Sequence, residues 1–170
     1  TFKLCIMNIK KIIYCLFSLF LFIFSNVKGQ DTTFQKKFSF GGNELSHSVH
    51  IVNDINGGGY LACGNTDITG AYDAHLTRID TAGNLIWSKQ YGSAEYEDLF
   101  SVVQTPGGNY IGVGYAYSSA LGADVYVINT DPAGNLIWSK TFDVGPNDYG
   151  YAIAKTMDDQ YVIVGSTSAG

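Results

Sequence analysis

The sequence predicts an all-β protein, and more specifically a partial β-propeller of four-stranded antiparallel blades. A heptapeptide occurs twice without change, at Gly83–Lys89 and Gly134–Lys140, so the chain repeats with a period of 51 residues. Each period holds four short runs rich in Val, Ile and aromatic residues, separated by Gly, Asn, Asp or Pro, which is the pattern of β-strands. Four strands in about 40–50 residues is the size of one propeller blade.

The turn residues predict hairpins between successive strands of each blade. Asp80–Asn84 and Asp131–Asn135 connect the third and fourth strands, and Gly57–Gly59 and Pro106–Asn109 connect the first and second. Asp hydrogen-bonds the backbone two residues on, Pro presets φ, and Gly accepts a positive φ. These are the features of short hairpin loops built on a type I turn.

The alternative all-β architecture is a two-sheet sandwich, whose strands alternate apolar and polar residues because one face of each sheet is wet. The runs Leu85–Trp87 and Tyr161–Val164 are continuously apolar. Such runs favour sheets that are covered on both faces, as stacked blades are. The sequence therefore favours the propeller and leaves the sandwich as the alternative.

In chain order, residues 1–29 read as upstream residues followed by a signal-peptide helix. Met7 is the expected start, a basic pair follows, and Ile12–Phe24 is an apolar run too short for an ordinary membrane span. Gly29 supplies a small residue at the expected cleavage site. An uncleaved membrane anchor is the alternative interpretation.

Residues 30–170 are predicted to form an incomplete β-propeller. A lone strand at 33–40 matches the fourth strand of a blade, and we expect it to pair with a blade encoded beyond Gly170, because ring closure removes exposed edges. We therefore expect an N-terminal fragment of a longer chain, whose missing blades are its partners. The predicted segments are a lone strand 33–40, a blade 41–91, a blade 92–142 and a partial blade 143–170.

Charge and cysteine content exclude some functions. Beyond residue 29 lie fifteen acidic and six basic residues, for a net charge of −9. This charge opposes binding to nucleic acid, which needs clustered Lys and Arg, and docking on an anionic membrane. Cys63 is the single cysteine of this part, so it forms no disulfide within it, and it is expected to be a small buried hydrophobic residue.

No catalytic, cofactor or metal site is predicted. His47 and His50 are expected on opposite faces of a strand, His75 at an ordinary strand position, and Gly112–Gly114 lacks the remainder of a dinucleotide motif. We interpret this glycine pair as a close approach of two backbones or as close packing between blades.

The recurrent acidic and tryptophan residues are interpreted structurally. Glu95, Glu97 and Asp98 form an acidic cluster on an expected connecting loop. Glu97 aligns with Glu44 and Asp148, which indicates a structural role repeated in each blade. Asp80 and Asp131 are expected to cap turns, and Asp73 and Asp124 are expected to open the third strands. Trp87 and Trp138 are expected to pack between blades. One Asp per turn offers too few of the six to eight oxygens that calcium takes.

The heptapeptide, the segment Asp148–Ile153 and the run Tyr161–Gly165 together resemble a known repeat family. They are similar to the secreted β-propeller repeats of Bacteroidetes-type proteins, which often end in a type IX secretion sorting domain. They are more distantly similar to the blades of quinoprotein-dehydrogenase-like proteins. The resemblance covers residues 34–170 and implies a polysaccharide or cell-surface setting, with some relatives labelled endoglucanase-like.

The expected function is a secreted or cell-surface scaffold, exported by the signal peptide, that acts as a non-catalytic binding or adhesion module for a polysaccharide or surface protein. Binding residues would lie on loops held by a rigid frame. The alternatives are part of a secreted polysaccharide-acting enzyme and a structural surface-layer repeat protein. No nucleic acid, cofactor or metal is expected, and no membrane association beyond the signal peptide.

Overall fold

The computed structural model describes residues 2–6, 34–38, 42–52, 57–68, 70–93, 95–120 and 122–168. Within these stretches the chain forms twelve β-strands and no helix, which confirms the all-β prediction. None of the described residues belongs to a helix able to cross a bilayer. The predicted signal-peptide segment Ile12–Phe24 lies outside the described residues.

Two complete periods of the repeat each form a four-stranded antiparallel sheet, with the strands in chain order, as the sequence predicts. The first sheet consists of β3 (Glu44–Val52), β4 (Gly59–Thr66), β5 (Asp73–Ile79) and β6 (Leu85–Tyr91). The second sheet consists of β7 (Tyr96–Gln104), β8 (Tyr110–Ser118), β9 (Gly122–Thr130) and β10 (Leu136–Phe142). The third sheet consists of β11 (Asp148–Lys155) and β12 (Tyr161–Thr167).

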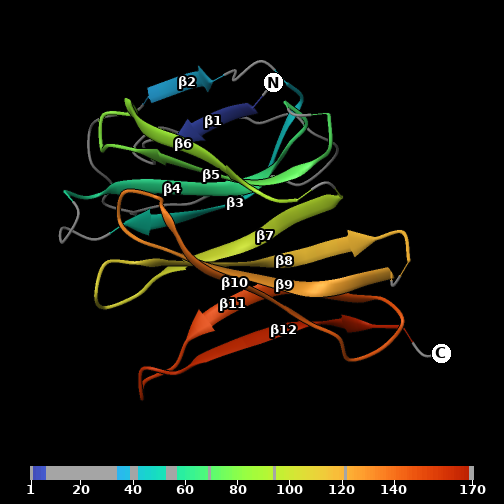
Figure 1. Cartoon of the computed structure of the whole chain (residues 1–170). Helices are drawn as coiled ribbons and strands as arrows, with labels where there is room; N and C mark the ends of the chain where they lie inside the picture. The colour runs from blue at the N-terminus through green and yellow to red at the C-terminus, as the bar shows by residue number, and fades with distance from the viewer. Residues whose placement is uncertain are drawn as a thin grey trace, which may run out of the picture.

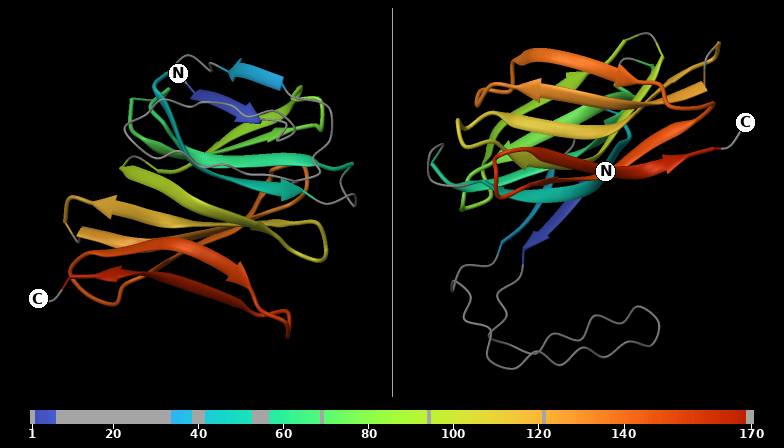
Figure 2. Two further views of the ribbon diagram at one scale, coloured as in Figure 1. Left: turned by 180° about the vertical axis from the view of Figure 1, so that it is seen from behind. Right: turned by 90° about the horizontal axis from the view of Figure 1, so that it is seen from below.

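The three sheets lie face to face in a stack, with the second sheet in the middle (Figure 1). The view from behind gives the same order of layers (Figure 2). Strand β7 packs against β3, β4 and β5, and β11 packs in the same way against β7, β8 and β9. The first strand of each sheet therefore crosses the face of the preceding sheet, and the same packing step occurs twice.

A hydrophobic core fills each of the two interfaces between sheets. The first core lies between the first and second sheets and contains the fully buried side chains of Leu61, Leu76 and Leu99. The second lies between the second and third sheets and contains Val113 and Ile153. Side chains alternate along a strand, so the middle sheet supplies both cores from its two faces.

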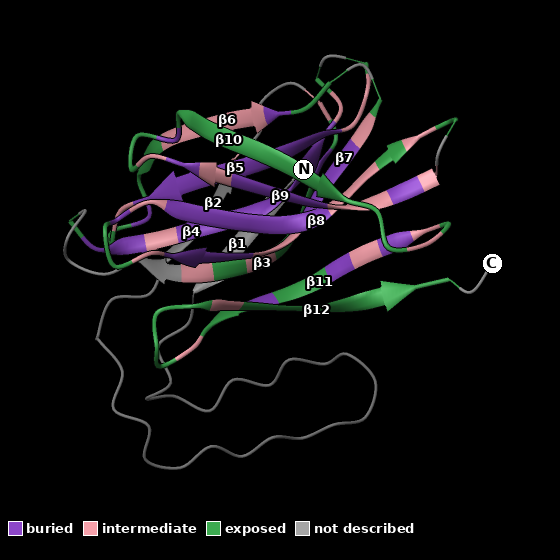
Figure 3. Ribbon diagram, turned by 60° about the horizontal axis from the view of Figure 1, so that its bottom comes forward, coloured by how far each residue is buried: buried purple, intermediate pink, exposed green. Residues whose placement is uncertain are grey.

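The second sheet lies between the first and third sheets, and strands β4 and β5 of the first sheet are buried along nearly their whole length. The runs Leu85–Trp87 and Tyr161–Val164 are not covered on both faces as predicted, because Leu85 is 45% exposed and Val164 is 58% exposed. Figure 3 shows that β10, an edge strand of the second sheet, and β12, in the third sheet, are largely exposed. The described strands form stacked antiparallel sheets and do not form the closed ring of a complete propeller.

A β-bulge recurs at the same position of the first strand in every sheet. The extra, unpaired residue is His47 in β3, Phe100 in β7 and Tyr151 in β11. The glycine opposite each bulge is Gly64, Gly114 or Gly165; a Cβ there would stand 1.8–1.9 Å from a carbonyl oxygen of the bulged strand. These glycines are therefore required by close backbone approach, as interpreted for Gly114.

The turns between third and fourth strands are held by their first aspartate. Asp80 Oδ1 accepts the backbone N–H groups of Ala82 and Asn84, both at 2.8 Å. Asp131 Oδ1 accepts the N–H of Asn135 at 2.7 Å. The glycines of these turns have φ of 79° at Gly83 and 76° at Gly134. The turn-capping interpretation of both aspartates is confirmed.

The strand predicted at 33–40 is present as β2 (Phe34–Phe38), with a different partner from the one expected. It pairs antiparallel with β1 (Phe2–Ile6), from the segment assigned to upstream residues. An unpaired strand carries a row of free backbone donors and acceptors, and pairing with any available strand satisfies them.

Candidate functional site

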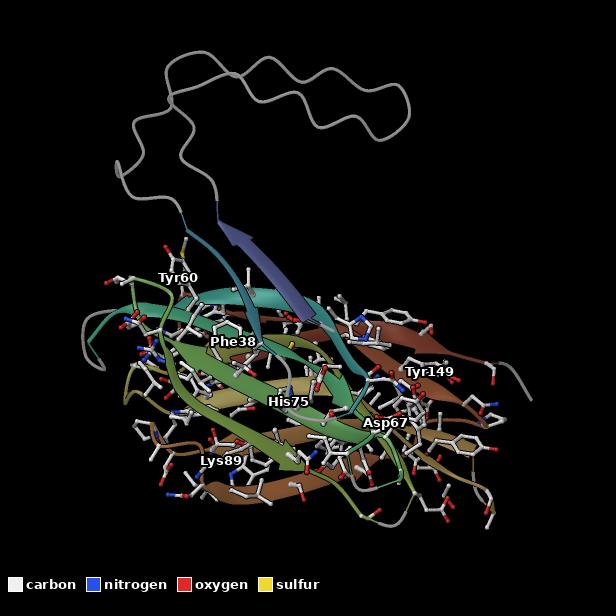
Figure 4. All side chains as sticks on the ribbon, turned by 90° about the horizontal axis from the view of Figure 1, so that it is seen from above. Phe38, Tyr60, Asp67, His75, Lys89 and Tyr149 are labelled. Carbon is white, nitrogen blue, oxygen red and sulfur yellow. The ribbon has the colours of Figure 1, made fainter. Side chains whose placement is uncertain are left out.

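The strongest candidate for a functional site is a continuous set of aromatic side chains at one end of the stacked sheets. Ring centroids are 5.0 Å apart for Tyr72–Tyr96, 5.6 Å for Tyr96–Tyr115, and 5.0 Å for Tyr115–Tyr149. We call this set the aromatic row; its members are Tyr72, Tyr96, Phe100, Tyr115, Tyr149 and Tyr151. Figure 4 places Tyr149 and Asp67 toward one end of the sheets and Tyr60 toward the other.

Two members of the aromatic row, Phe100 and Tyr151, are bulged residues, and the third bulged residue, His47, lies next to the row. The His47 ring lies 4.9 Å from Phe100, edge to face, and Phe100 lies 5.7 Å from Tyr151. These three residues are the bulged residues of β3, β7 and β11, so each sheet contributes one ring to a file that runs across the stack. Centroid distances of 4.5–7 Å are those of favourable ring pairs.

The aromatic row is only partly buried. Tyr151 is 51% exposed, whereas Tyr96, Phe100, Tyr115 and Tyr149 are half-buried. Burial first, and then a hydrogen bond with the Tyr96 side chain, raise the pKa of Tyr115, so its hydroxyl stays protonated across the physiological range. The row therefore offers neutral ring faces and hydroxyl groups to solvent.

A buried carboxylate lies beside the row in the first interface. Asp98 is 3% exposed, and its Oδ2 accepts a hydrogen bond from Asn65 Nδ2 at 2.7 Å and lies 3.0 Å from His47 Nε2. Burial raises the pKa of Asp98, against the lowering effects of His47 and Asn65. At the equivalent position the first sheet has Leu45 and the third has Tyr149, so Asp98 departs from the repeat.

Contrary to the sequence prediction, His47 and His50 contact the same neighbouring strand. His47 meets Asp98 near one end of β7, and His50 Nε2 accepts the N–H of Gln104, 3.3 Å away, at the other. The bulge at His47 inserts one residue and shifts the alternation of side chains, which the spacing alone does not reveal. The two imidazoles reach different ends of β7.

The acidic cluster at residues 95–98 was wrongly assigned to a loop, because β7 begins at Tyr96 and includes Glu97 and Asp98. Glu97 is buried and accepts hydrogen bonds from the Ser93 hydroxyl (2.6 Å) and backbone N–H (3.2 Å). Glu44 and Asp148 are also buried and accept backbone N–H groups just upstream, those of Gly42 and of Val144 and Gly145. The repeated structural role predicted for these three residues is confirmed.

Three carboxylates, from β9, from the connection between β10 and β11, and from the start of β11, could hold a cation. One oxygen from each of Asp124, Asp143 and Asp148 lies within 4.8 Å of the others. Burial and the charges of Asp143 and Asp148 raise the pKa of Asp124. A calcium ion takes six to eight oxygens, and Asp148 is already engaged with two backbone N–H groups, so the set is incomplete as a calcium site.

The remaining candidate residues have structural surroundings. Cys63 is a buried free thiol, as predicted, and burial raises its pKa to about 12. His75 is buried in β5 with Nε2 2.6 Å from Ser88 Oγ, and burial lowers its pKa to about 4. Trp87 packs against the first core, 6.1 Å from the Tyr110 ring, as the inter-blade interpretation expects. The inter-blade interpretation was wrong for Trp138, which is 36% exposed, because β10 is exposed along its whole length.

Sequence reasoning identified the bulge positions as equivalent but missed the aromatic row. The signal was present in His47, Phe100 and Tyr151, which precede matching residues one period apart. Tyr115 and Tyr149 carried no such signal, because their contact joins different positions of different periods. No protein-family model matches the chain, and no curated protein matches it.

Proposed function

We propose that the chain forms part of a β-propeller scaffold, exported by an N-terminal signal peptide to the medium or the cell surface, with a non-catalytic binding or adhesion function. Repetition of one packing step between successive sheets supports the propeller. The basic pair and the apolar run within Met7–Gly29 support export. The resemblance to secreted Bacteroidetes-type repeats agrees with both.

The observation that carries the binding function is the aromatic row. Rigid aromatic side chains give large contact areas at small entropic cost and are enriched at binding surfaces. Two of them, Phe100 and Tyr151, lie at bulges whose backbones are fixed by opposing glycines, and the half-buried rings of the row remain accessible. A file with one ring per sheet suits a ligand that is itself periodic, and the apolar faces of sugar rings stack on such side chains. A polysaccharide is therefore the proposed ligand class.

The test measures binding of the chain to a panel of neutral and acidic soluble polysaccharides by affinity gel electrophoresis. Replacing the exposed ring in Tyr151→Ala should weaken binding about tenfold, the loss of roughly 1.4 kcal/mol of stacking. Ile137→Ala is the matched control, because Ile137 has a similar exposure of 52% and lies in β10. Equal retardation of both variants, or none by any polysaccharide, would count against the proposal.

A polysaccharide-acting enzyme is the second candidate, favoured by one observation. Asp98 is a buried carboxyl with a raised pKa beside His47, the type of group that serves as a general acid. Glycoside hydrolysis normally needs a second carboxylate, and the neighbouring Glu97 is engaged by Ser93. Release of reducing sugar that is lost in Asp98→Asn would favour the enzyme over the scaffold.

A further inference from the structure

The two ends of the stacked sheets differ in charge. We call the end that carries the aromatic row the aromatic end; there β3, β7 and β11 begin, and β4, β8 and β12 end. The sheets meet at this end, where the Glu97 N–H donates to the carbonyl of Tyr72 at 2.7 Å and Ala123 forms an isolated bridge with Asn147. The opposite end carries the turns between the third and fourth strands.

The basic side chains of the first two sheets lie away from the aromatic end. The sequence has no Lys or Arg from residue 38 to residue 77 or from residue 90 to residue 139. Arg78 lies next to the last residue of β5, at the opposite end. Lys89 Nζ donates to Asn135 Oδ1 at 2.6 Å, in a turn of the opposite end, and Lys140 Nζ lies 5.5 Å from the centre of the Trp138 ring. The described part of these two sheets therefore offers no Lys or Arg to the aromatic row.

Carboxylates, in contrast, gather at the aromatic end. Glu95 is exposed and directly precedes Tyr96 of the row, and its Oε2 accepts the N–H of Ser119 at 2.9 Å. Asp67 is partly exposed, and hydrogen bonds from the backbone and side chain of Asn43 hold its pKa below the usual range, so its charge persists at neutral pH. Both carboxylates belong to connections between strands of the first two sheets, so they can face a ligand on the row.

A buried carboxylate lies directly behind the row. Asp98 and Tyr115 are opposite each other in β7 and β8, so their side chains share one face of the second sheet. Asp98 is 3% exposed, its Oδ1 has no hydrogen-bond partner among the described residues, and its basic neighbour is His47, 3.0 Å from Oδ2. Burial, the Tyr96 side chain and the charge of Asp98 raise the pKa of Tyr115, so the negative field reaches the rings themselves.

We propose that the ligand of the aromatic row is a polysaccharide that carries amino groups, such as a polymer of glucosamine units. Its ammonium groups supply the positive charge that the aromatic end lacks, and a cation near the face of a Tyr or Phe ring is attracted by the ring quadrupole. An acidic polysaccharide is repelled by the same carboxylates. The inference names the ligand class of the proposed binding function and rests on that function.

The test titrates the full chain with oligomers of glucosamine and of N-acetylglucosamine of equal length, followed by calorimetry at slightly acidic pH. The two oligomers differ only in their acetyl groups, and only the first is cationic. The glucosamine oligomer should bind about tenfold more tightly at low salt. The difference should shrink as salt rises, because exposed charges are screened. Acid also charges His47 beside Asp98, so a trimethylated glucosamine oligomer, which is cationic at every pH, repeats the comparison at neutral pH.

Matched variants separate the charge from the rings. Glu95→Gln should weaken binding of the glucosamine oligomer about threefold, as expected for one exposed charge, and leave the acetylated oligomer unaffected. Asp158→Asn is the control, because it makes the same change of charge in the turn between β11 and β12, at the opposite end. Tyr151→Ala should weaken binding of both oligomers, because it removes a ring and no charge.

The outcomes distinguish this inference from the proposed function. Equal affinities for the two oligomers, or binding of a neutral or acidic polysaccharide where the glucosamine oligomer does not bind, would overturn the inference and leave the binding function of the row intact. Absence of binding to every polysaccharide would overturn both. An oligolysine that binds as tightly as the glucosamine oligomer would also overturn the inference, because charge without sugar rings would then suffice.

Discussion

The two interfaces of the stack share their geometry but not their chemistry. The first, between the first and second sheets, contains an apolar core together with the His47–Asp98 pair and Asn65. The second, between the second and third sheets, is filled by aliphatic side chains such as Val113 and Ile153. Repetition thus fixes how the sheets pack, and single departures from the repeat, of which Asp98 is the clearest, give each interface its own properties.

The interfaces also differ in extent. The first is closed at its outer part by the turn Asp131–Asn135, where the Pro132 carbonyl accepts the Trp87 indole N–H, whereas the second lacks an equivalent cover over Trp138 among the described residues. All three histidines of the chain, His47, His50 and His75, lie in the first sheet. The first interface should therefore be the more stable at neutral pH, and the first sheet should be the more sensitive to acid.

Core truncation should show the largest difference. Leu99→Ala removes a fully buried side chain from the first core and should lower the free energy of unfolding by about 4 kcal/mol, within the range for buried Leu. Ile153→Ala, at the second interface, should cost about 2 kcal/mol, because the exposed third sheet can relax around it. Urea denaturation gives both values; equal losses would show that the interfaces do not differ in packing.

Acid should destabilise the first sheet. The pKa of His75 is about 4 in the folded chain and 6.5 in the unfolded chain, so its contribution is complete above pH 6.5 and is lost as pH falls to 4. The free energy of unfolding should fall by about 3 kcal/mol, since each unit of pKa difference corresponds to about 1.36 kcal/mol. Burial also lowers the pKa of His50, which adds in the same direction.

The measurement is urea denaturation between pH 7 and pH 4, with hydrogen exchange to locate the opening. His75→Val is the control, because valine at this strand position carries no titratable group. This variant should flatten the pH dependence. A steep dependence that persists in the variant would assign the acid sensitivity to other groups.

The two tryptophans offer a comparison within one sequence motif. Trp87→Ala should cost about 2 kcal/mol, below the range for a fully buried Trp, since Trp87 is half-buried and loses its bond to Pro132. Trp138→Ala should change stability by less than about 0.5 kcal/mol, as for other exposed positions. Thermal unfolding of both variants tests this, and a larger effect of Trp138→Ala would contradict the assigned cover.

The smallest effect is expected at the turns. Asp131→Ala loosens the turn that lies on Trp87, whereas Asp80→Ala loosens the equivalent turn of the first sheet. We expect the midpoint of thermal unfolding to fall slightly for both and further for Asp131→Ala. Identical shifts would indicate that the turn acts only within its own hairpin.

The period, the strands and the turns were predictable because they depend on local spacing: Gly83–Lys89 and its copy fix the period, and Asp80 and Asp131 fix the turns. The bulges were not, because an unpaired residue such as His47 leaves no mark in the alternation until the partner strand is known. For the same reason the faces of His47 and His50 were wrong. The environment of Asp98 depends on His47 and Asn65 across an interface, which no local pattern encodes.

The glycine opposite each bulge fixes the backbone conformation there, and the identity of the bulged side chain can vary. Gly64, Gly114 and Gly165 keep the main chain in one shape, while the displayed residue is His47, Phe100 or Tyr151. Substitution there changes what the surface offers to a ligand and leaves the hydrogen-bond ladder intact. Such a position can vary from copy to copy during evolution, so a family of these repeats can acquire new ligands one ring at a time.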